Sequence, residues 1–335
     1  MTTRDQGPAG FDFVGFLAKY AAPLFLVALV ALFTLLEPRF LHPLNIMNIL
    51  RQVSISGLVA VGMTFVILTA GIDLSVGSLV ALCGLVAAYV AKGGLDDRFA
   101  LGAAADSGNP VIVAVMAAVA VGMACGALQG FAITRFRVPP FVVTLGGLTA
   151  FRGAALLLSG GGPISGFEMG YVWWGQGRVW GIPVPVIIFA LAAMIAHVVL
   201  TQSQFGRHVY AIGGNPQAAE LNGVSTRRTT MTVYVIIGAF CGIASFLLSA
   251  RLNSAEAVAG LQLELDVIAA VVIGGTSLFG GVGSIFGTVV GVILIGVLRN
   301  GLVLLNVSTF VQQILIGVIL VLAVAIDQRA KQRGG

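Results

Sequence analysis

Two ionisable side chains, Asp73 and Arg152, occur inside segments that are otherwise apolar. A charge in such surroundings is costly, so each residue is a functional candidate that would face a partner or a wet cavity. Asp73 lies in the sequence GIDLSVG, for which two compatible interpretations stay open. With Ser75 it could shape a re-entrant turn beside a solute path, or it could cap a helix that begins at Leu74 near the surface.

Arg152 leaves similar alternatives open. In the middle of an apolar run, its guanidinium could serve a solute path or gate. It could equally hold the fold together through an ion pair or through bonds to backbone carbonyl groups. The sequence does not decide between these roles, nor whether Asp73 is the partner of an ion pair.

A third feature is the density of glycine between Gly274 and Gly287, where six glycines occur. A straight packed helix does not need so many, so the pattern predicts a broken helix or a close backbone crossing. The backbone groups of a break could bond to hydroxyl groups of a passing solute, whereas tight packing would need no ligand. The polar candidates of this part of the chain are Gly274, Gly275, Thr276, Ser277 and Asn300, and the amides of Asn300, Gln312 and Gln313 could equally tie helices together.

Residue sets typical of enzymes are missing from the sequence. A phosphate-binding P-loop needs a lysine after its glycine-rich turn, and none of the three lysines follows such a pattern. The three histidines are far apart, and the cysteines have no CxxC or histidine partner, so we interpret them as packing residues. We therefore expect no catalytic site, metal or cofactor in this chain; the residues concerned are Lys19, Lys92, Lys331, His42, His197, His208, Cys83, Cys125 and Cys241.

The elements that position these residues are predicted from hydropathy. Hydrophobic residues make up 58% of the chain and charged residues 9%, and the mean hydropathy is +1.02. A soluble domain carries roughly a quarter charged residues, so the composition predicts an integral membrane protein in contact with lipid. The arginines are scattered, which argues against nucleic-acid binding despite the net charge of +5. We predict one all-α domain, residues 1–335, with about ten spans: Ala21–Leu36, Ile49–Thr69, Val76–Ala91, Val111–Thr134, Phe141–Ser159, Val184–Leu200, Thr230–Ser249, Leu265–Leu278, Ile285–Val297 and Thr309–Ile326.

The distribution of positive charge predicts the orientation of this bundle. Cytoplasmic loops carry an excess of lysine and arginine. The best fit places three segments in the cytoplasm: the N-terminal tail 1–20, the connection 201–229 and the C-terminal tail 327–335. Arg51, Arg251 and Arg299 then fall in outer loops.

The connection Gly206–Arg228 contains strong helix punctuation. Asn215 is a suitable N-cap, Pro216 suits the first helical position, and Gly223 suits the left-handed residue that ends a helix. These signals predict a short helix over Pro216–Asn222. A capped helix of this kind could dock on a soluble subunit, or it could be an ordinary loop with one helical turn.

This connection, GGNPQAAELNG, resembles the cytoplasmic coupling loop of permease subunits of bacterial ABC importers, in the branch that imports ribose, xylose and related sugars. Three further segments are similar to that branch: LTAGIDLSVGSLVAL, PPFVVTLGGLTAFRGAALLLSGGGPIS and GGTSLFGGVGSIFGTVVGVILIGVLRN. The resemblance covers nearly the whole chain. The residues that it assigns to coupling are Gly213, Gly214, Asn215, Pro216, Ala218, Ala219, Glu220, Leu221 and Gly223.

The resemblance implies a multi-pass protein of the bacterial inner membrane that forms the translocation path for a monosaccharide. It also implies three partners: a second permease copy, cytoplasmic ATPase subunits and a periplasmic sugar-binding protein. The sequence does not identify the sugar. The alternative is an ion-coupled secondary transporter, which would need embedded carboxylates for the coupling ion, and Asp73 is the one obvious acid in an apolar run.

Overall fold

The computed structural model describes residues 13–93 and 110–334, and most of them are helical. The elements are α1 (Phe13–Leu36), the 3-10 turn η1 (Pro38–Leu41), α2 (Pro43–Leu68), α3 (Val76–Ala91), α4 (Val111–Phe136), α5 (Pro140–Ser159), β1 (Ile164–Ser165), α6 (Met169–Gln176), β2 (Arg178–Val179), β3 (Ile182–Pro183), α7 (Val184–Gln202), α8 (Gln204–Gly214), α9 (Pro216–Leu221), α10 (Thr226–Leu252), β4 (Ser254–Ala255), α11 (Leu263–Ile273), α12 (Ile285–Leu304) and α13 (Thr309–Gly334).

The all-α, polytopic prediction is confirmed. Within the described residues, six helices are long and apolar enough to cross a membrane: α2, α4, α5, α7, α10 and α12. The apolar parts of α1, α3 and α13 are shorter, and α11 has only 11 residues. Each predicted apolar run contains a helix, but the predicted count of about ten spans exceeds the six that length and hydropathy support.

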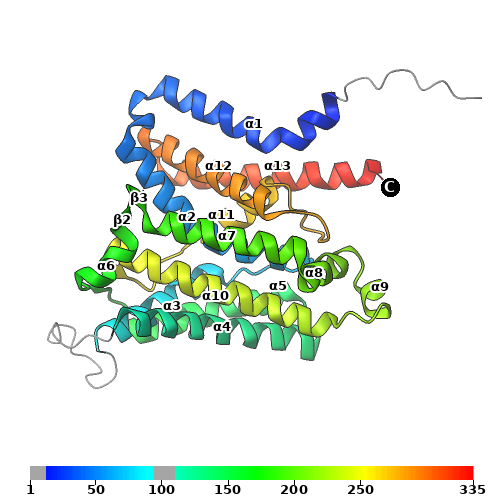
Figure 1. The fold of residues 1–335 in the computed structure, drawn as a ribbon, viewed down its shortest axis with the longest axis horizontal. Helices are drawn as coiled ribbons and strands as arrows, with labels where there is room; N and C mark the ends of the chain where they lie inside the picture. The colour runs from blue at the N-terminus through cyan, green and yellow to red at the C-terminus, as the bar shows by residue number, and fades with distance from the viewer. Residues whose placement is uncertain (1–12, 94–109, 335) are drawn as a thin grey trace, which may run out of the picture.

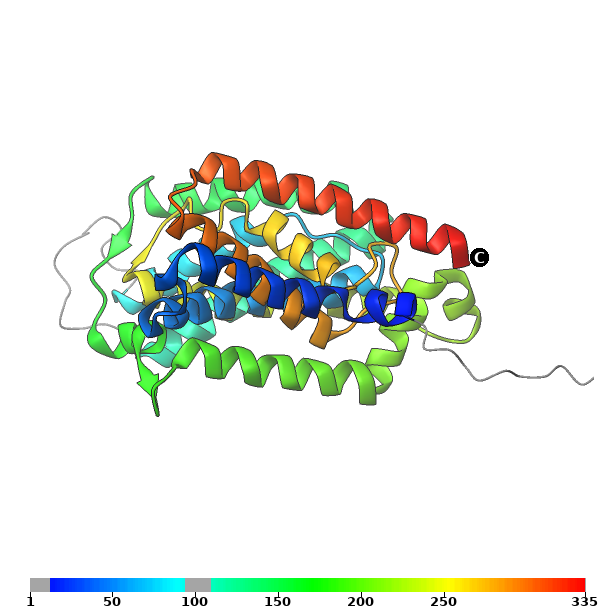
Figure 2. The ribbon, with the colours of Figure 1, turned by 90° about the horizontal axis from the view of Figure 1, so that it is seen from above.

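The bundle is built around α2, whose second half is almost entirely buried. It packs against α7, α10, α11 and α12, while α7 and α13 lie on opposite sides of the molecule (Figures 1 and 2). Within the described residues, α4 and α10 form the most extensive helix–helix contact. Gly122 and Gly238 bring their backbones into direct contact, and a side chain at either position would overlap the other helix. Small residues allow this approach in membrane helices.

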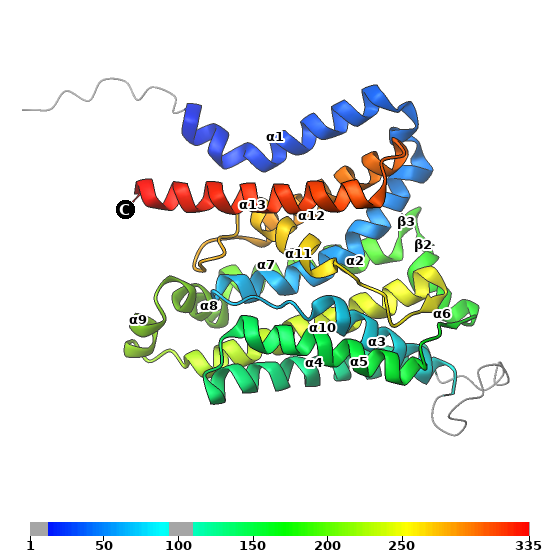
Figure 3. The same ribbon diagram turned by 180° about the vertical axis from the view of Figure 1, so that it is seen from behind.

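Two stretches of the chain repeat the same order of elements. In the first, α2 is followed by a non-helical segment, residues 69–75, and then by the short helix α3, which packs on α4 and α5. In the second, α10 is followed by residues 253–262 and the short helix α11, which packs on α12 and α13. We call residues 69–75 the first break and residues 253–262 the second break. Figure 3 shows each break running from one end of the bundle into its middle.

The predicted span Leu265–Leu278 is not one helix. α11 ends at Ile273, and residues 274–284, here called the glycine loop, are non-helical up to the start of α12. Hydropathy is averaged over the whole run, so it does not show that the helical backbone hydrogen bonds end at the glycines. The predicted helix is therefore too long.

The two ends of the bundle carry different elements. α8, α9, the start of α1 and the end of α13 lie together at one end, here called the α9 end (Figure 1). η1, α6 and the β2–β3 hairpin lie at the opposite end, here called the α6 end (Figure 1). At the α6 end, β1 pairs antiparallel with β4, with Ile164 opposite Ala255, which ties the α5–α6 connection to the second break.

Candidate functional site

The first break is held by a buried polar cluster, here called the Asp73 cluster: Asp73, Ser75 and Gln129. Asp73 is fully buried, and its Oδ1 accepts hydrogen bonds from the Ser75 backbone N–H at 2.8 Å and the Ser75 hydroxyl at 2.7 Å. Gln129 of α4 donates from Nε2 to Ser75 Oγ at 2.8 Å. A side chain that bonds to the backbone two residues on stabilises a local turn, here the turn that leads into α3.

The interpretation of Asp73 as a cap near the surface is wrong in two respects. The carboxyl is inside the protein, and α3 begins at Val76 with Ser75 as the residue before it, not at Leu74. The side chain satisfies the turn that precedes the helix rather than the first turn of the helix itself. The other interpretation, a turn at a break in the backbone, agrees with the geometry.

The backbone of the first break is bonded from two further helices. The carbonyl oxygen of Ile72 accepts from Thr144 Oγ1 of α5 at 3.2 Å and from the Tyr234 hydroxyl of α10 at 3.4 Å. Asp73 Oδ2 and Gln129 Oε1 are buried and have no hydrogen-bond partner in the described part of the chain. Buried acceptors of this kind favour a donor such as water or a hydroxyl group.

The second break is held by Arg152. Its Nη1 donates to the carbonyl oxygen of Ala257 and, at 3.0 Å, to that of Ala259. The ion pairs among the described residues are Arg39–Glu37 and Arg299–Asp266, so Arg152 does not pair with Asp73. Of the open alternatives, the geometry is that of a clamp on backbone carbonyl groups; a role in a path or gate stays a prediction.

The glycine loop has the predicted break and the predicted close crossing. Gly274 and Gly287 lie backbone to backbone, with no room for a side chain at either position. Gly280 and Gly281 have φ angles of 82° and 74°, which favour glycine. The loop reaches the end of α2, where the Gly281 N–H donates to the Leu68 carbonyl at 3.0 Å.

Two predicted pathway residues of the glycine loop, Thr276 and Ser277, are buried. Thr276 Oγ1 has no hydrogen-bond partner among the described residues. Gly275, by contrast, adopts a φ of 90° with open space beside it. The loop therefore places one unsatisfied hydroxyl next to a region of irregular backbone, and a pathway role for these residues stays a prediction.

The capped helix predicted at Asn215 is present as α9, one residue shorter than expected. Asn215 Oδ1 accepts from the Ala218 N–H at 2.9 Å, Pro216 follows at the first helical position, and Gly223 beyond the helix has a φ of 80°. Glu220 is exposed and Leu221 is 89% exposed. A single exposed apolar side chain is ordinary on a protein surface, so the docking role of α9 stays a prediction.

The end of α8 connects α9 to the glycine loop and to the last residue of α2, which precedes the first break. The Gly213 backbone lies directly against the Leu68 carbonyl and the Gly281 N–H, and a side chain at position 213 would overlap both. The Tyr210 hydroxyl donates to the Gly283 carbonyl at 2.9 Å. Burial raises the pKa of Tyr210, so this hydroxyl stays a donor at neutral pH. These contacts join the end of α8 to the end of α2 and to the glycine loop.

The amide candidates tie helices together. The side chains of Asn300 and Asn45 exchange two hydrogen bonds, at 2.8 and 2.9 Å, which link α12 to α2. Gln312 donates to the Val307 carbonyl at 2.9 Å, and Gln313 is exposed. Among the predicted residues, the structure brings together Asp73 with Ser75 and Gly213 with the glycine loop, whereas Asn300 lies apart from both.

Sequence reasoning missed Gln129, Tyr210, Tyr234 and the pair Asp266–Arg299. Arg299 was expected in an outer loop, but it lies within α12, and its Nη2 is 2.6 Å from Asp266 Oδ1. Asp73 is therefore not the one acid in the apolar runs. Asp266 and Arg299 carry opposite charges in two successive apolar segments, and this was the signal from which the ion pair could have been predicted. No comparable signal marks a glutamine or tyrosine whose partner is a carbonyl or hydroxyl group.

Comparisons with known proteins agree with the resemblance. The chain is 43% identical over 319 residues to the ribose import permease protein RbsC of Bacillus subtilis, with 95% of each chain covered. It is 38% identical over 332 residues to the D-allose transport system permease protein AlsC of Escherichia coli, with 98% of each covered. It is 35% identical over 370 residues to the xylose transport system permease protein XylH of Escherichia coli, with 92% and 91% covered.

No solved structure matches the chain significantly. A family model does match, over residues 45–324, which include the Asp73 cluster, both breaks, the glycine loop and α9. The chain therefore belongs to the family described as the branched-chain amino acid transport system / permease component.

Proposed function

We propose that this protein is the membrane-spanning permease of an ATP-driven importer for a monosaccharide in the bacterial inner membrane. The observation that carries the proposal is the contact between Gly213 and the backbones of Leu68 and Gly281, because it connects the exposed helix α9 to the end of α2 and to the glycine loop. The names of the relatives, which are permeases for ribose, allose and xylose, support a sugar over the amino acids in the family description.

The α9 end is cytoplasmic in this proposal. Arg207, Arg227 and Arg228 are exposed there, and positive charge favours the cytoplasmic side. The start of α1 and the end of α13 lie at the same end (Figure 1), as a bundle with an even number of crossings requires. Short helices such as α3 and α11 would each cross together with the break that precedes them, which restores a count of about ten.

Separate ATPase subunits supply the energy. Their closure on nucleotide would press on α9, and the Gly213 and Tyr210 contacts would carry the displacement to the glycine loop and to the end of α2. A second permease copy would complete the path, and a periplasmic binding protein would deliver the sugar at the α6 end. The permease need not bind sugar tightly, because it must release what it receives.

Uptake by the reconstituted importer tests the proposal. Proteoliposomes would contain the permease with its cognate ATPase and binding protein, and radiolabelled D-ribose, D-xylose and D-allose would serve as probes. We expect ATP-dependent uptake of at least one sugar, abolished by a catalytically inactive ATPase. Uptake that survives without the ATPase but is lost with an ionophore would instead indicate an ion-coupled transporter.

A further inference from the structure

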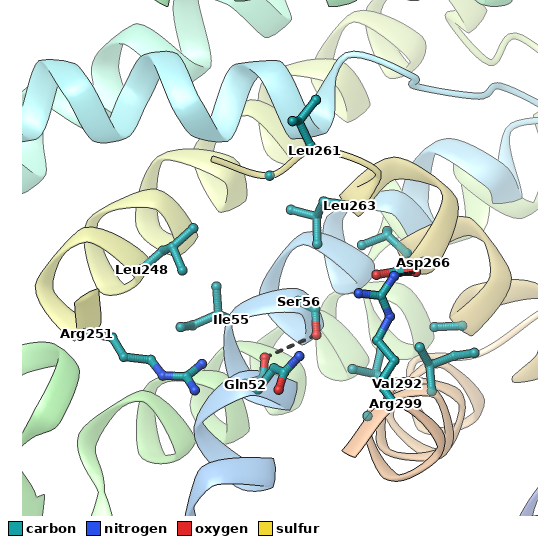
Figure 4. A pocket seen from close by; sticks show the side chains of 15 residues that line it. Gln52, Ile55, Ser56, Leu248, Arg251, Leu261, Leu263, Asp266, Val292 and Arg299 are labelled. Carbon is teal, nitrogen blue, oxygen red and sulfur yellow. Dashed lines mark hydrogen bonds and ion pairs between the residues drawn. The ribbon is translucent and has the colours of Figure 1, made fainter. Parts of the chain in front are cut away.

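A cavity of about 170 Å³ lies beside the second break, between α2, α10, α11 and α12 (Figure 4). A water molecule in the liquid occupies roughly 30 Å³, so the cavity exceeds the size of a single bound water. Gly260 and Leu261 of the second break form one wall. A second cavity, of about 180 Å³, borders the same break and is also lined by residues of α3 and α10.

The first cavity contains charged groups that the protein does not fully satisfy. Arg299 donates to Asp266, yet its buried Nε has no partner among the described residues. The structure shows no hydrogen bond or ion pair for the guanidinium of Arg251 within residues 13–93 and 110–334. Figure 4 shows Arg251 on one side, the Asp266–Arg299 pair on the other, and Gln52 and Ser56 of α2 between them.

The remaining lining is apolar. Ile55, Leu248, Leu263 and Val292 surround the polar groups (Figure 4). Binding sites for small molecules combine apolar walls with a few convergent polar groups in this way. A lipid chain would leave the guanidinium groups and the amide unsatisfied, which is unfavourable inside a membrane protein.

We propose that this cavity is a binding site for a small neutral polyhydroxylated solute, a transit site for the sugar on the α6 side of the bundle. The proposal rests on the proposed function. Hydroxyl groups both donate and accept, so they can satisfy the guanidinium donors of Arg251 and Arg299 together with the acceptor oxygens of Asp266 and Gln52. The lining carries two guanidinium groups and one carboxylate, which is paired with Arg299, so an anion is the competing ligand, and inorganic phosphate is therefore one of the probes in the test below.

The position of the cavity agrees with a transit role. Gly260 in its wall lies directly against Gly77 at the start of α3, two residues beyond the Asp73 cluster. Arg152 of α5 bonds to two carbonyl groups of the second break, which forms this wall. A shift of that break would change the cavity, and solute leaving it would be close to the unsatisfied acceptors of the first break.

Protection of an introduced cysteine tests the site. Ser56→Cys places a thiol in the cavity, while Ser254→Cys places one beside the second cavity. The native cysteines are buried. The variants would be reconstituted with the ATPase, and the rate of modification by a small polar thiol reagent would be measured with D-ribose, D-xylose, D-allose or inorganic phosphate. We expect a transported sugar to slow modification of the Ser56→Cys variant severalfold and to leave the Ser254→Cys variant unchanged.

A second substitution keeps the test decisive. In the Ser56→Cys background, Arg251→Gln should raise the sugar concentration for half-protection by about tenfold, because a bond to a charged donor is lost. Arg178→Gln, an exposed arginine at the same end, should not. Unchanged protection by sugar in the Arg251→Gln variant, or protection by phosphate alone, would overturn the proposal. If no sugar is transported by the wild-type importer, the proposed function fails, whereas normal transport without protection overturns this inference alone.

Discussion

The two breaks occupy equivalent places in the order of elements but are stabilised differently. The first is closed by side chains from α4, α5 and α10, which bond to Ser75 and to the Ile72 carbonyl, and its carboxyl is fully buried. The second is held at its start by the pairing of β4 with β1 and further along by Arg152, which bonds to two of its carbonyl groups, and it borders two cavities.

This difference indicates different mechanical roles. A buried segment bonded from three helices has few alternative arrangements, so the first break should move as a rigid unit with its neighbours. A segment flanked by cavities and clamped at two carbonyl groups can shift at lower cost, since local opening is easiest where packing is sparse. We therefore interpret the first break as a fixed joint and the second break as a movable wall, and each of the following predictions tests this comparison.

The largest effect is expected from Asp73→Ala, which removes the centre of the fixed joint. The buried Ser75 N–H and hydroxyl would lose their acceptor, and bonds to a charged group contribute about 1.5–3 kcal/mol each. We expect the free energy of unfolding to fall by about 3 kcal/mol or more. The amount of folded protein in the membrane and its thermal unfolding in detergent would measure this.

Asp73→Asn is the control, because the amide keeps one acceptor oxygen. It should accumulate in the membrane nearly as the wild type does and retain most uptake. A variant that folds normally but transports nothing would show that the charge itself is used in transport, and the first break would then be more than a fixed joint.

The next largest effect is expected from Arg152→Ala, which releases the movable wall. Uptake should fall to background, while folded protein should stay near the wild-type amount, because only bonds to two carbonyl groups of one segment are lost. Arg152→Lys should restore part of the uptake, since an ammonium can still donate to one carbonyl. Wild-type uptake by Arg152→Ala would show that the second break does not need these hydrogen bonds. Arg178→Ala is the matched control, because it removes a positive charge without removing the bonds to the second break.

The two breaks also differ in how far the sequence predicted them. Hydropathy located the helices, and Asp73 and Arg152 were found because charges inside apolar runs are conspicuous. Their contacts were not predictable, because Gln129, Thr144 and Tyr234 reach the first break from helices distant in sequence. The second break lies in a stretch that the predicted spans left as a connection, but nothing in residues 253–262 indicated that it enters the bundle. The cavity beside it depends on Asp266 and Arg299 meeting across α11 and α12.

A smaller effect is expected from Leu221→Glu, which tests whether the ATPase docks on α9. Ala219, which the resemblance also assigns to coupling, is buried, so a charge at that position would test the packing of α9 instead of docking. Leu221 is exposed, and placing a charge at an apolar contact leaves it unpaired when a partner covers it. We expect ATP-dependent uptake to fall by about tenfold with folded protein unchanged.

Gln217→Glu adds the same charge to α9 without removing the apolar side chain and should have a weaker effect. Normal uptake and normal stimulation of the ATPase by Leu221→Glu would separate α9 from docking. The ATPase would then have to act on the permease at a site other than α9. The proposed link from α9 to the end of α2 and the first break would lose its basis.

The smallest effect is expected from Thr144→Val, which removes one of the two donors to the Ile72 carbonyl in the fixed joint. The two side chains have similar shape, so the change removes mainly the hydroxyl, and the Tyr234 hydroxyl still bonds to the same oxygen. The loss in the free energy of unfolding should be about 1 kcal/mol, measured as a small decrease in the unfolding temperature with uptake unchanged.

The double variant sharpens this test. Tyr234→Phe alone should lower the free energy of unfolding by a similar amount, but the double variant should lower it by more than the sum, because the buried Ile72 carbonyl then has no donor. Additive losses would mean that the joint tolerates an unsatisfied backbone group, and the first break would be no more rigid than the second.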